Sequence, residues 1–249
     1  MRHLSALLLA FAALTARAQD TEWRVPFITT PDEVVVRMLE LAGTRAGDLV
    51  ADLGSGDGRI VITAARNFGA RGLGIELDAA LVDSSRKNAA AAGVADRVSI
   101  VQGDVLTADF SQASVVMVYL LPNLMSQLQP RFVSELKPGT RIVSHSFRMT
   151  GWRPDRSDSM RIAGRHPGQG DESTLYLWIV PAEVRGTWTG GGRRLRIEQS
   201  FQEIEVEAAT QASLSGSEIS WQTRQGRFHG RVQGDRIVGD DGVVLMRSR

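Results

Sequence analysis

The chain of 249 residues contains no cysteine. This absence excludes disulfides, cysteine-based zinc sites, a thiol nucleophile and a cysteine for lipid attachment. Histidine is also scarce, and the four histidines show no metal-binding spacing such as HExxH. We therefore predict that the protein has no metal centre.

An excess of either charge is absent as well. The 29 basic residues nearly balance the 28 acidic residues, which gives a net charge of +1. A near-neutral chain exerts no long-range attraction on nucleic acids or on anionic membranes, so we expect neither as a partner. Hydrophobic residues make up 43% of the chain, which is enough for a sizeable core and argues against wholesale disorder.

The N-terminal apolar run is too short to cross a membrane. It covers about 11 residues from Leu4 to Leu14, follows Arg2, and precedes Ala16-Arg17-Ala18, an A-x-A cleavage pattern. This arrangement predicts a signal peptide over residues 1–18, export to the periplasm, and no stable membrane insertion after cleavage. A mitochondrial presequence remains the alternative, because the segment has arginines and no acidic residue before Asp20. Cleavage would leave 27 basic and 28 acidic residues.

Short apolar runs alternate with helical patterns over much of the chain. Strands are predicted at 48–53, 71–76, 97–101, 113–120 and 140–146. Helices are predicted at 58–67, 78–92 and 122–135, with a weaker pattern at 106–110. Strands separated by helices at this spacing indicate right-handed crossovers and a parallel, doubly wound, Rossmann-like sheet.

A further helix is predicted before the first strand, in "TPDEVVVRMLELAG". Thr30 suits the N-cap, Pro31 suits the first helical position, and Glu33 would complete a capping box. Gly43 is expected to end this helix.

The pattern changes after Phe147. "MRIA" and "STLYLWIVP" are two strands without a helix between them, which predicts an antiparallel hairpin at the end of a domain over residues 19–181. Residues 182–249 show only short alternating strands with glycine turns and predict a small antiparallel β domain. Its Trp188, Trp221 and Phe228 are expected to fill its own core, although recruitment of a substrate remains the alternative.

A glycine loop, "DLGSGDGRI", follows the first predicted strand from Asp52 to Ile60. Glycines allow a sharp turn and a close approach of a ligand to the main chain, although a tight turn that binds nothing has the same appearance. The spacing is G-x-G-x-G, and Arg59 stands where the third glycine of a dinucleotide fingerprint is required. This departure disfavours a nicotinamide-dependent oxidoreductase.

Three segments together resemble class I S-adenosylmethionine-dependent methyltransferases, over roughly residues 27–180. "VADLGSGDGRI" is similar to motif I of that family, "GLGIELD" to its second strand, and "VSIVQGDVL" to its third strand with the following turn. The resemblance implies that S-adenosyl-L-methionine is the cofactor and that seven residues bind it: Asp52, Gly54, Gly56, Gly58, Glu76, Asp104 and Val105.

The resemblance also implies a role for each of these positions. Asp52 would fix the methionine end of the cofactor, directly or by shaping the loop. Glu76 would accept hydrogen bonds from the ribose hydroxyls, and such charge-assisted bonds are strong. Asp104 would meet the adenine amino group, with Val105 packed on the ring. Asp78 is expected to be only a helix cap.

The acceptor site of the family follows the fourth strand, where this chain has "YLLPN" from Tyr119 to Asn123. This segment departs from the signature for methylation of nucleic-acid bases and is closer to bacterial relatives of protein-lysine methyltransferases. The resemblance therefore implies a protein substrate, with lysine as the acceptor and Tyr119 and Asn123 as candidate catalytic residues. In those bacterial relatives the segment before the first helix (the lead segment) closes over the cofactor. This resemblance makes Phe27, Thr29 and Thr30 candidates for a lid.

Two alternatives remain open at this point. Tyr119 and His145 could both be structural residues at strand ends, and Pro122 is expected to start a helix rather than to act in the reaction. The predicted export also favours a second hypothesis: a non-catalytic module that binds a nucleoside or a partner on a methyltransferase fold.

Overall fold

The computed structural model describes residues 28–166 and 170–248. The helices are α1 Asp32–Leu41, α2 Arg59–Phe68, α3 Ala79–Ala91 and α4 Pro122–Glu135. The first sheet is formed by β1 Leu49–Leu53, β2 Arg71–Glu76, β3 Val98–Gln102, β4 Val115–Val118, β5 Arg141–His145, β6 Arg156–His166 and β7 Gly170–Ile179.

The first sheet has the order β3-β2-β1-β4-β5-β7-β6. Strands β1 to β5 are parallel, whereas β7 pairs antiparallel with β5 and β6 pairs antiparallel with β7. The strand order reverses direction between β1 and β4, so the carboxyl ends of both strands open into a shared crevice. The predicted Rossmann-like sheet with a late antiparallel hairpin is confirmed.

Helices cover both faces of this sheet. Buried residues of α1 and α2 pack on one face, and α3 packs against α2 and β3. Helix α4 packs on the opposite face through Met125, Leu128 and Phe132, which are fully buried. Local signals set these helices in place, since Pro122 begins α4 and the carboxylate of Asp78 caps α3 by accepting from the main-chain N–H groups of Ala80 and Leu81.

Residues 106–110 form the end of a turn followed by irregular chain, and not the predicted helix. Asp104 starts this segment, because its carbonyl accepts from the main-chain N–H groups of Thr107 and Ala108. Phe110 then turns into the core and meets Phe132 edge to face at 5.9 Å. The apolar residues that suggested a helix are therefore anchored by tertiary packing.

The capping box predicted at α1 is wrong. Pro31 is the N-cap, and no side chain caps the helix. The Thr30 hydroxyl instead lies 3.3 Å from the Nδ1 atom of His145, and the Glu33 carboxylate accepts from the main-chain N–H of Ala163 at 2.7 Å. Both side chains bind distant segments, which competed successfully with the local cap.

A second, antiparallel sheet follows β7, as predicted. Its order is β10-β9-β8-β15-β14-β13-β12-β11. The strands are β8 Gly186–Gly190, β9 Arg193–Ser200, β10 Glu203–Val206, β11 Gln211–Ser215, β12 Glu218–Thr223, β13 Gly226–Gln233, β14 Arg236–Gly239 and β15 Val244–Arg247. Trp188, Trp221 and Phe228 are buried in its own core, where the rings of Trp221 and Phe228 stack at 4.1 Å. The core-filling role predicted for these aromatic residues is confirmed.

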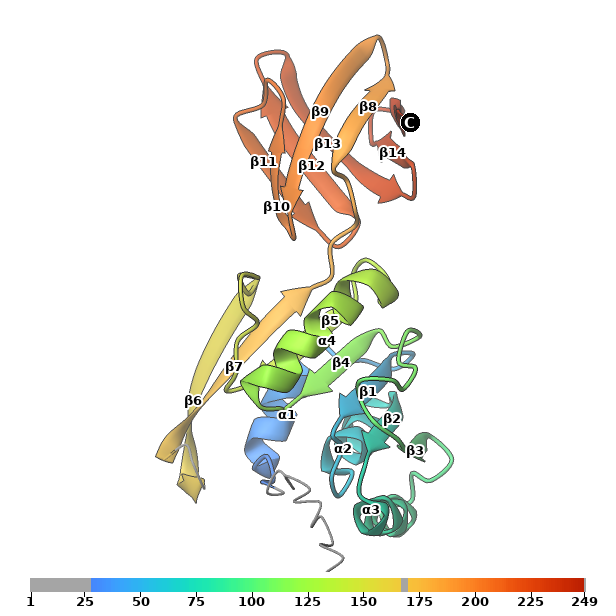
Figure 1. Ribbon diagram of the computed structural model, residues 1–249, viewed down its shortest axis with the longest axis vertical. Coiled ribbons are helices and arrows are strands. Elements are labelled where there is room, and N and C mark those ends of the chain that lie inside the picture. Colours follow the sequence, from blue (N-terminus) through green and yellow to red (C-terminus); the bar gives the residue numbers. More distant parts are fainter. Residues whose placement is uncertain (1–27, 167–169, 249) are drawn as a thin grey trace, which may run out of the picture.

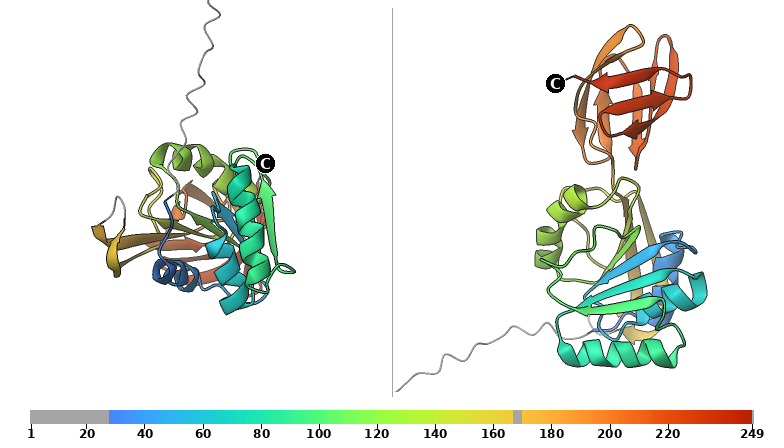
Figure 2. Two further views of the ribbon diagram at one scale, coloured as in Figure 1. Left: turned by 90° about the horizontal axis from the view of Figure 1, so that it is seen from below. Right: turned by 90° about the vertical axis from the view of Figure 1, so that its right-hand side faces the viewer.

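The second sheet lies beyond one end of the first sheet and is joined to it by the chain between β7 and β8 (Figure 1, Figure 2). The ring of Phe201, in the turn between β9 and β10, stacks on Trp152 at 4.9 Å. Gln202 accepts from the Trp152 indole N–H at 2.8 Å and donates to the Arg153 carbonyl at 2.6 Å. The second sheet is therefore attached to the domain of the first sheet by packing and hydrogen bonds, in addition to the connecting chain.

None of the helices in the described residues is long and apolar enough to span a bilayer. The predicted leader, residues 1–18, and Phe27 lie outside the described residues. Within the described ranges, no cluster of three or more histidine or acidic side chains is arranged to hold a metal ion.

Candidate functional site

The three acids singled out from the sequence lie along one edge of the first sheet. Asp52 is near the end of β1, Glu76 ends β2 in register with Gln102, and Asp104 follows β3. These strands are parallel neighbours, so their carboxyl ends meet at the same edge, which is where ligands of such sheets bind. The structure thus brings the three acids to one rim.

The loop between β1 and α2 requires its glycines. Gly54, Gly56 and Gly58 have φ angles of 81°, 54° and 81°, in the left-handed region that other residues avoid. Gly58 is also the N-cap of α2, and a Cβ atom there would collide with Ser85 Oγ.

Main-chain N–H groups of this loop are used inside the protein. Those of Gly54 and Ser55 donate to the Ile75 carbonyl at 2.9 and 3.0 Å, and that of Gly58 donates to Ser55. The Gly56 N–H donates to the Glu76 carboxylate at 2.8 Å. A loop that binds pyrophosphate turns such donors towards the ligand. This loop therefore fits a ligand without a phosphate group.

Glu76 is buried and held in one orientation. One carboxylate oxygen accepts from the Gly56 N–H at 2.8 Å, and the other accepts from the Asp78 N–H at 2.9 Å. Each carboxylate oxygen has about two lone-pair sites, so both can accept a further bond. This arrangement suits two adjacent hydroxyl groups, such as those of a ribose.

Asp52 is an unusual acid for the interior of a sheet. It is 3% exposed, and within residues 28–166 and 170–248 no donor reaches its carboxyl group. Burial, with the negative charges of Glu76 and Asp57 added, raises the pKa of Asp52 to about 8. A buried acid next to two others favours a cation, and S-adenosylmethionine carries both a sulfonium and an ammonium group.

Asp104 lies at the exposed end of the same rim. One carboxylate oxygen accepts from the Leu106 N–H at 2.8 Å, which fixes the turn. Val105 is buried in the main core, and its carbonyl accepts from Arg131 at 2.9 Å. Leu77, an apolar residue between Glu76 and Asp78, is 69% exposed next to this rim.

Arg59 joins the glycine loop to the segment before α1. Its guanidinium donates to the Asp57 carboxylate at 2.6 Å and to the Thr30 carbonyl at 2.9 Å. The arginine that departs from a dinucleotide fingerprint thus fastens the lead segment next to the loop.

The predicted acceptor segment lies at the carboxyl end of β4. The Tyr119 ring is half-buried and lies 4.3 Å from the His145 ring and 6.2 Å from the Phe147 ring, between centroids. Leu120 contacts the glycine loop, since its Cδ2 atom lies 3.0 Å from the position of a Cβ built on Gly54. Asn123 is exposed in the first turn of α4, and its side-chain oxygen accepts from the Leu124 N–H at 2.9 Å.

A surface depression of about 260 Å³ lies outside this rim. Its walls come from α1, α2, α3 and the outer side of the glycine loop, and none of the three acids on the rim lines it. The lining residues are Asp32, Val36, Asp57, Arg59, Ile62, Thr63, Arg66, Asn67 and Asn88.

A Rossmann-like sheet with an antiparallel hairpin, a glycine loop that suits no phosphate, and acids along its rim define the class I methyltransferase architecture. Residues 52–156 match the family of the ANTKMT methyltransferase domain. A protein-lysine N-methyltransferase from Saccharolobus islandicus (strain REY15A) is 46% identical over 157 residues, which cover 63% of this chain and 94% of that protein. The chain therefore belongs to the class I S-adenosylmethionine-dependent methyltransferases, and S-adenosyl-L-methionine is its cofactor.

Two further relatives are named for different acceptors. The mouse (Mus musculus) adenine nucleotide translocase lysine N-methyltransferase is 36% identical over 132 residues, covering 53% of this chain and 57% of that protein. An RNA methyltransferase from Salinibacter ruber, solved with S-adenosylhomocysteine, is 50% identical and superimposes with a TM-score of 0.58. This match covers 63% of this chain and 96% of that structure.

Proposed function

We propose that the protein transfers a methyl group from S-adenosylmethionine to the ε-amino group of lysine in a protein substrate. The observation that carries the proposal is the apolar, aromatic acceptor segment at the end of β4, where Tyr119 packs against His145 and Phe147 and the next residue, Leu120, contacts the glycine loop. Two of the relatives described above, which are named as lysine methyltransferases, support it.

We propose that the cofactor is held by the residues predicted from the sequence. Glu76 would accept from the ribose hydroxyls, Asp104 from the adenine amino group, and Asp52 would face the methionine end. Gly54, Gly56 and Gly58 would let the main chain approach the ligand, while Val105 would support the adenine from below.

The cofactor supplies a methyl group on a sulfonium, which is displaced in line by the acceptor, so the protein mainly aligns the two groups. A lysine has an ordinary pKa near 10.4 and must lose a proton before it attacks. Apolar walls formed by Tyr119, Leu120 and Leu121 would favour the neutral amine by removing water. Tyr119 is then the candidate that touches the acceptor, and Asn123, which is exposed nearby, could bind the substrate main chain.

RNA is the acceptor against which this proposal must be tested, because the Salinibacter ruber relative is named for it. The balance of 29 basic and 28 acidic residues argues against RNA, since nucleic-acid binding depends on an excess of positive charge.

The test incubates the purified protein and labelled S-adenosylmethionine separately with total protein and total RNA of the host, with Glu76→Ala as the control. Label in protein, found as N-methyl-lysine by mass spectrometry and absent with Glu76→Ala, is the expected result. Label in RNA would contradict the proposal. Cofactor binding without transfer to either acceptor would favour the non-catalytic module.

We also propose that residues 1–18 are removed as a signal peptide and that the protein acts in the periplasm, with residues 19–181 as the methyltransferase domain and 182–249 as the β domain. The leader pattern supports this proposal. Sequencing the N-terminus of protein recovered from a periplasmic extract should find Gln19 first. A protein that stays in the cytosol with residues 1–18 attached would contradict it.

A further inference from the structure

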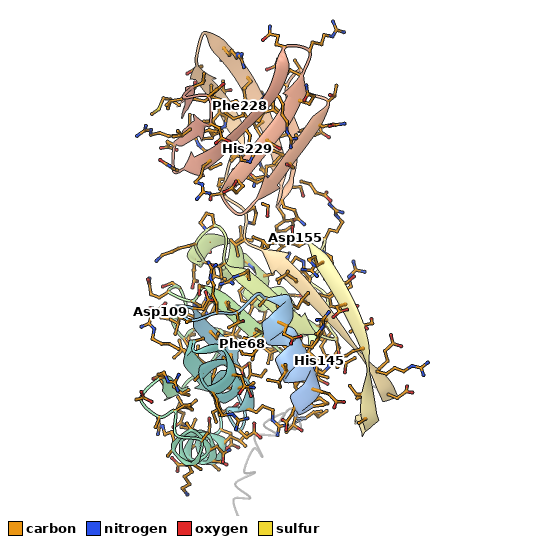
Figure 3. The ribbon with its side chains drawn as sticks, turned by 180° about the vertical axis from the view of Figure 1, so that it is seen from behind. Phe68, Asp109, His145, Asp155, Phe228 and His229 are labelled. Carbon is orange, nitrogen blue, oxygen red and sulfur yellow. The ribbon has the colours of Figure 1, made fainter. Side chains whose placement is uncertain are left out.

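His145 is fully buried at the carboxyl end of β5 and is held from two sides. Its Nδ1 atom lies 3.3 Å from the Thr30 hydroxyl, in the segment before α1. Its Nε2 atom lies 3.1 Å from the hydroxyl of Ser173, which is also fully buried, in β7. Three segments that are far apart in the sequence therefore meet at one imidazole ring, within the first part of the molecule and away from the second sheet (Figure 3).

The pairing with two hydroxyls suits a neutral imidazole. In that form one ring nitrogen donates and the other accepts, and a hydroxyl can take either role. Both tautomers of His145 are therefore satisfied, and rotating the ring would break two buried hydrogen bonds together. The two hydroxyls fix the plane of the ring.

Tyr119 packs against this fixed plane. Its ring centroid lies 4.3 Å from that of His145, with 37° between the planes, and Phe147 lies nearly parallel to it at 6.2 Å. The turn that places Phe147 is strained, because Ser146 has a φ angle of 68°. Two bonds hold it, from the Ser146 N–H to the Thr174 carbonyl at 2.8 Å and from the Ser144 hydroxyl to the Phe147 carbonyl at 2.7 Å. Strain that is maintained in this way is typical of functional sites.

Thr30 connects the same ring to the cofactor side. Its carbonyl accepts from Arg59 at 2.9 Å, and Arg59 is bound to Asp57 of the glycine loop. Thr30 is 4% exposed, so its main chain and its side chain are both fixed in the interior. Thr30 thus links the glycine loop, through Arg59, to the His145 ring against which Tyr119 packs.

We propose that His145 is a positioning residue: it sets the orientation of Tyr119 at the acceptor site and couples that orientation to the seating of the lead segment against the glycine loop. The proposal rests on the proposed function for the role of Tyr119. It assigns a purpose to Thr30 and Ser173, which lie far from the acceptor segment in the sequence and hold the His145 ring.

The test is a double-mutant cycle. Thr30→Val and Ser173→Ala each remove one hydroxyl from the ring, and each should lower the rate of methyl incorporation into total host protein about tenfold at saturating S-adenosylmethionine. Because both release the same ring, the double variant should also be about tenfold slower, whereas independent effects would multiply to about a hundredfold. Thr30→Ser restores the hydroxyl and should therefore recover most of the rate that Thr30→Val loses.

Thr140→Val is the matched control. Thr140 directly precedes β5, is 3% exposed, and donates through its hydroxyl to the Ala113 carbonyl at 3.3 Å. The control therefore removes a buried hydroxyl with a similar hydrogen bond, at the opposite end of the strand. We expect it to lower thermal stability about as much as Thr30→Val and to leave the rate unchanged.

A second readout needs no acceptor. The protein has two tyrosines, so incorporation of 3-fluorotyrosine gives two fluorine resonances, which a Tyr119→Phe variant assigns. With S-adenosylhomocysteine present, Thr30→Val and Ser173→Ala should each shift or broaden the Tyr119 resonance, and Thr140→Val should leave it in place. This arm remains informative even if the lysine acceptor is wrong.

Two results would overturn the proposal. A Tyr119 resonance that neither variant moves would show that the ring does not orient the tyrosine. Rates that multiply in the double variant would show that the two hydroxyls act separately. Failure of the proposed function has a different signature, namely label in RNA or in no acceptor while the fluorine shifts occur as expected.

Discussion

Replacing Asp52 by asparagine should change how the stability of the ligand-free protein depends on pH. The pKa of Asp52 is raised to about 8 from an ordinary 3.8 because the group is buried and lies near Glu76 and Asp57. A raised folded-state pKa means that the neutral acid is favoured in the fold. Its stabilising contribution is fully present below pH 3.8 and is lost as pH rises towards 8. Asparagine keeps the shape, has no charge, and should show no such loss.

The size of the effect follows from the slope of about 1.36 kcal/mol for each pH unit between the two pKa values. Urea unfolding of both proteins between pH 5 and pH 9 gives the difference in unfolding free energy directly. We expect the advantage of Asp52→Asn to grow by about 4 kcal/mol from pH 5 to pH 8 and then to level off. A constant offset from the buried amide would not alter this change with pH.

Two outcomes would refute the reasoning about Asp52. A stability difference that does not vary with pH would mean that the carboxyl titrates normally, and one that shrinks as pH rises would mean that the carboxylate form is favoured. A Glu76→Gln background provides a control, because removing the neighbouring negative charge should lower the Asp52 pKa and end the change at a lower pH.

Other predictions concern the glycine loop and the contact between the sheets. Gly56→Val should abolish cofactor binding and leave a folded protein by circular dichroism, whereas normal binding would refute the loop assignment. Gly58→Ala should destabilise the protein by roughly 1–3 kcal/mol, because φ is +81° and the new Cβ meets Ser85 Oγ. Adding Ser85→Ala should recover part of this loss in a thermal melt. No recovery would show that the collision with Ser85 does not cause the loss. Gln202→Ala should lower the unfolding free energy by about 1–3 kcal/mol by leaving buried polar groups unpaired. The control Gln211→Ala, at an exposed position, should change the unfolding free energy by less than about 0.5 kcal/mol. Equal effects would contradict the role given to Gln202 in the contact between the two sheets.

The sequence predicted those features that depend on neighbouring residues. Asp78 caps α3 and Pro122 begins α4 because a cap and a first-turn proline act within a few residues of themselves. The glycines after β1 were also informative, since their positive φ angles are a local requirement. Alternating strands and helices then fixed the parallel order of the sheet.

Features decided by distant contacts could not be predicted in this way. The sequence pattern of Thr30 and Glu33 is that of a capping box. In the fold, however, their side chains bind His145 and the main-chain N–H of Ala163 instead. The helical pattern at 106–110 failed for the same reason, because burial of Phe110 against α4 outweighs weak local propensity.

The candidate site shows the same division. The rim acids lie at or just after the carboxyl ends of three successive strands. Parallel pairing brings these ends to one edge, so a sequence pattern could locate the acids. The partnership of Thr30, His145 and Ser173 spans up to 115 residues in one contact, and nothing in the local sequence marks Ser173. The raised pKa of Asp52 likewise depends on burial that only the folded sheet provides.

Calorimetric titration with S-adenosylhomocysteine at pH 7 tests the central claim, that the rim formed by β1, β2 and β3 binds the methyl-donor nucleoside. We predict saturable binding to the wild type, release of nearly one proton as Asp52 loses its own to face the α-ammonium group of the ligand, and no binding to Glu76→Ala. Absence of binding to the wild type, or unchanged binding to Glu76→Ala in a folded protein, would contradict the account.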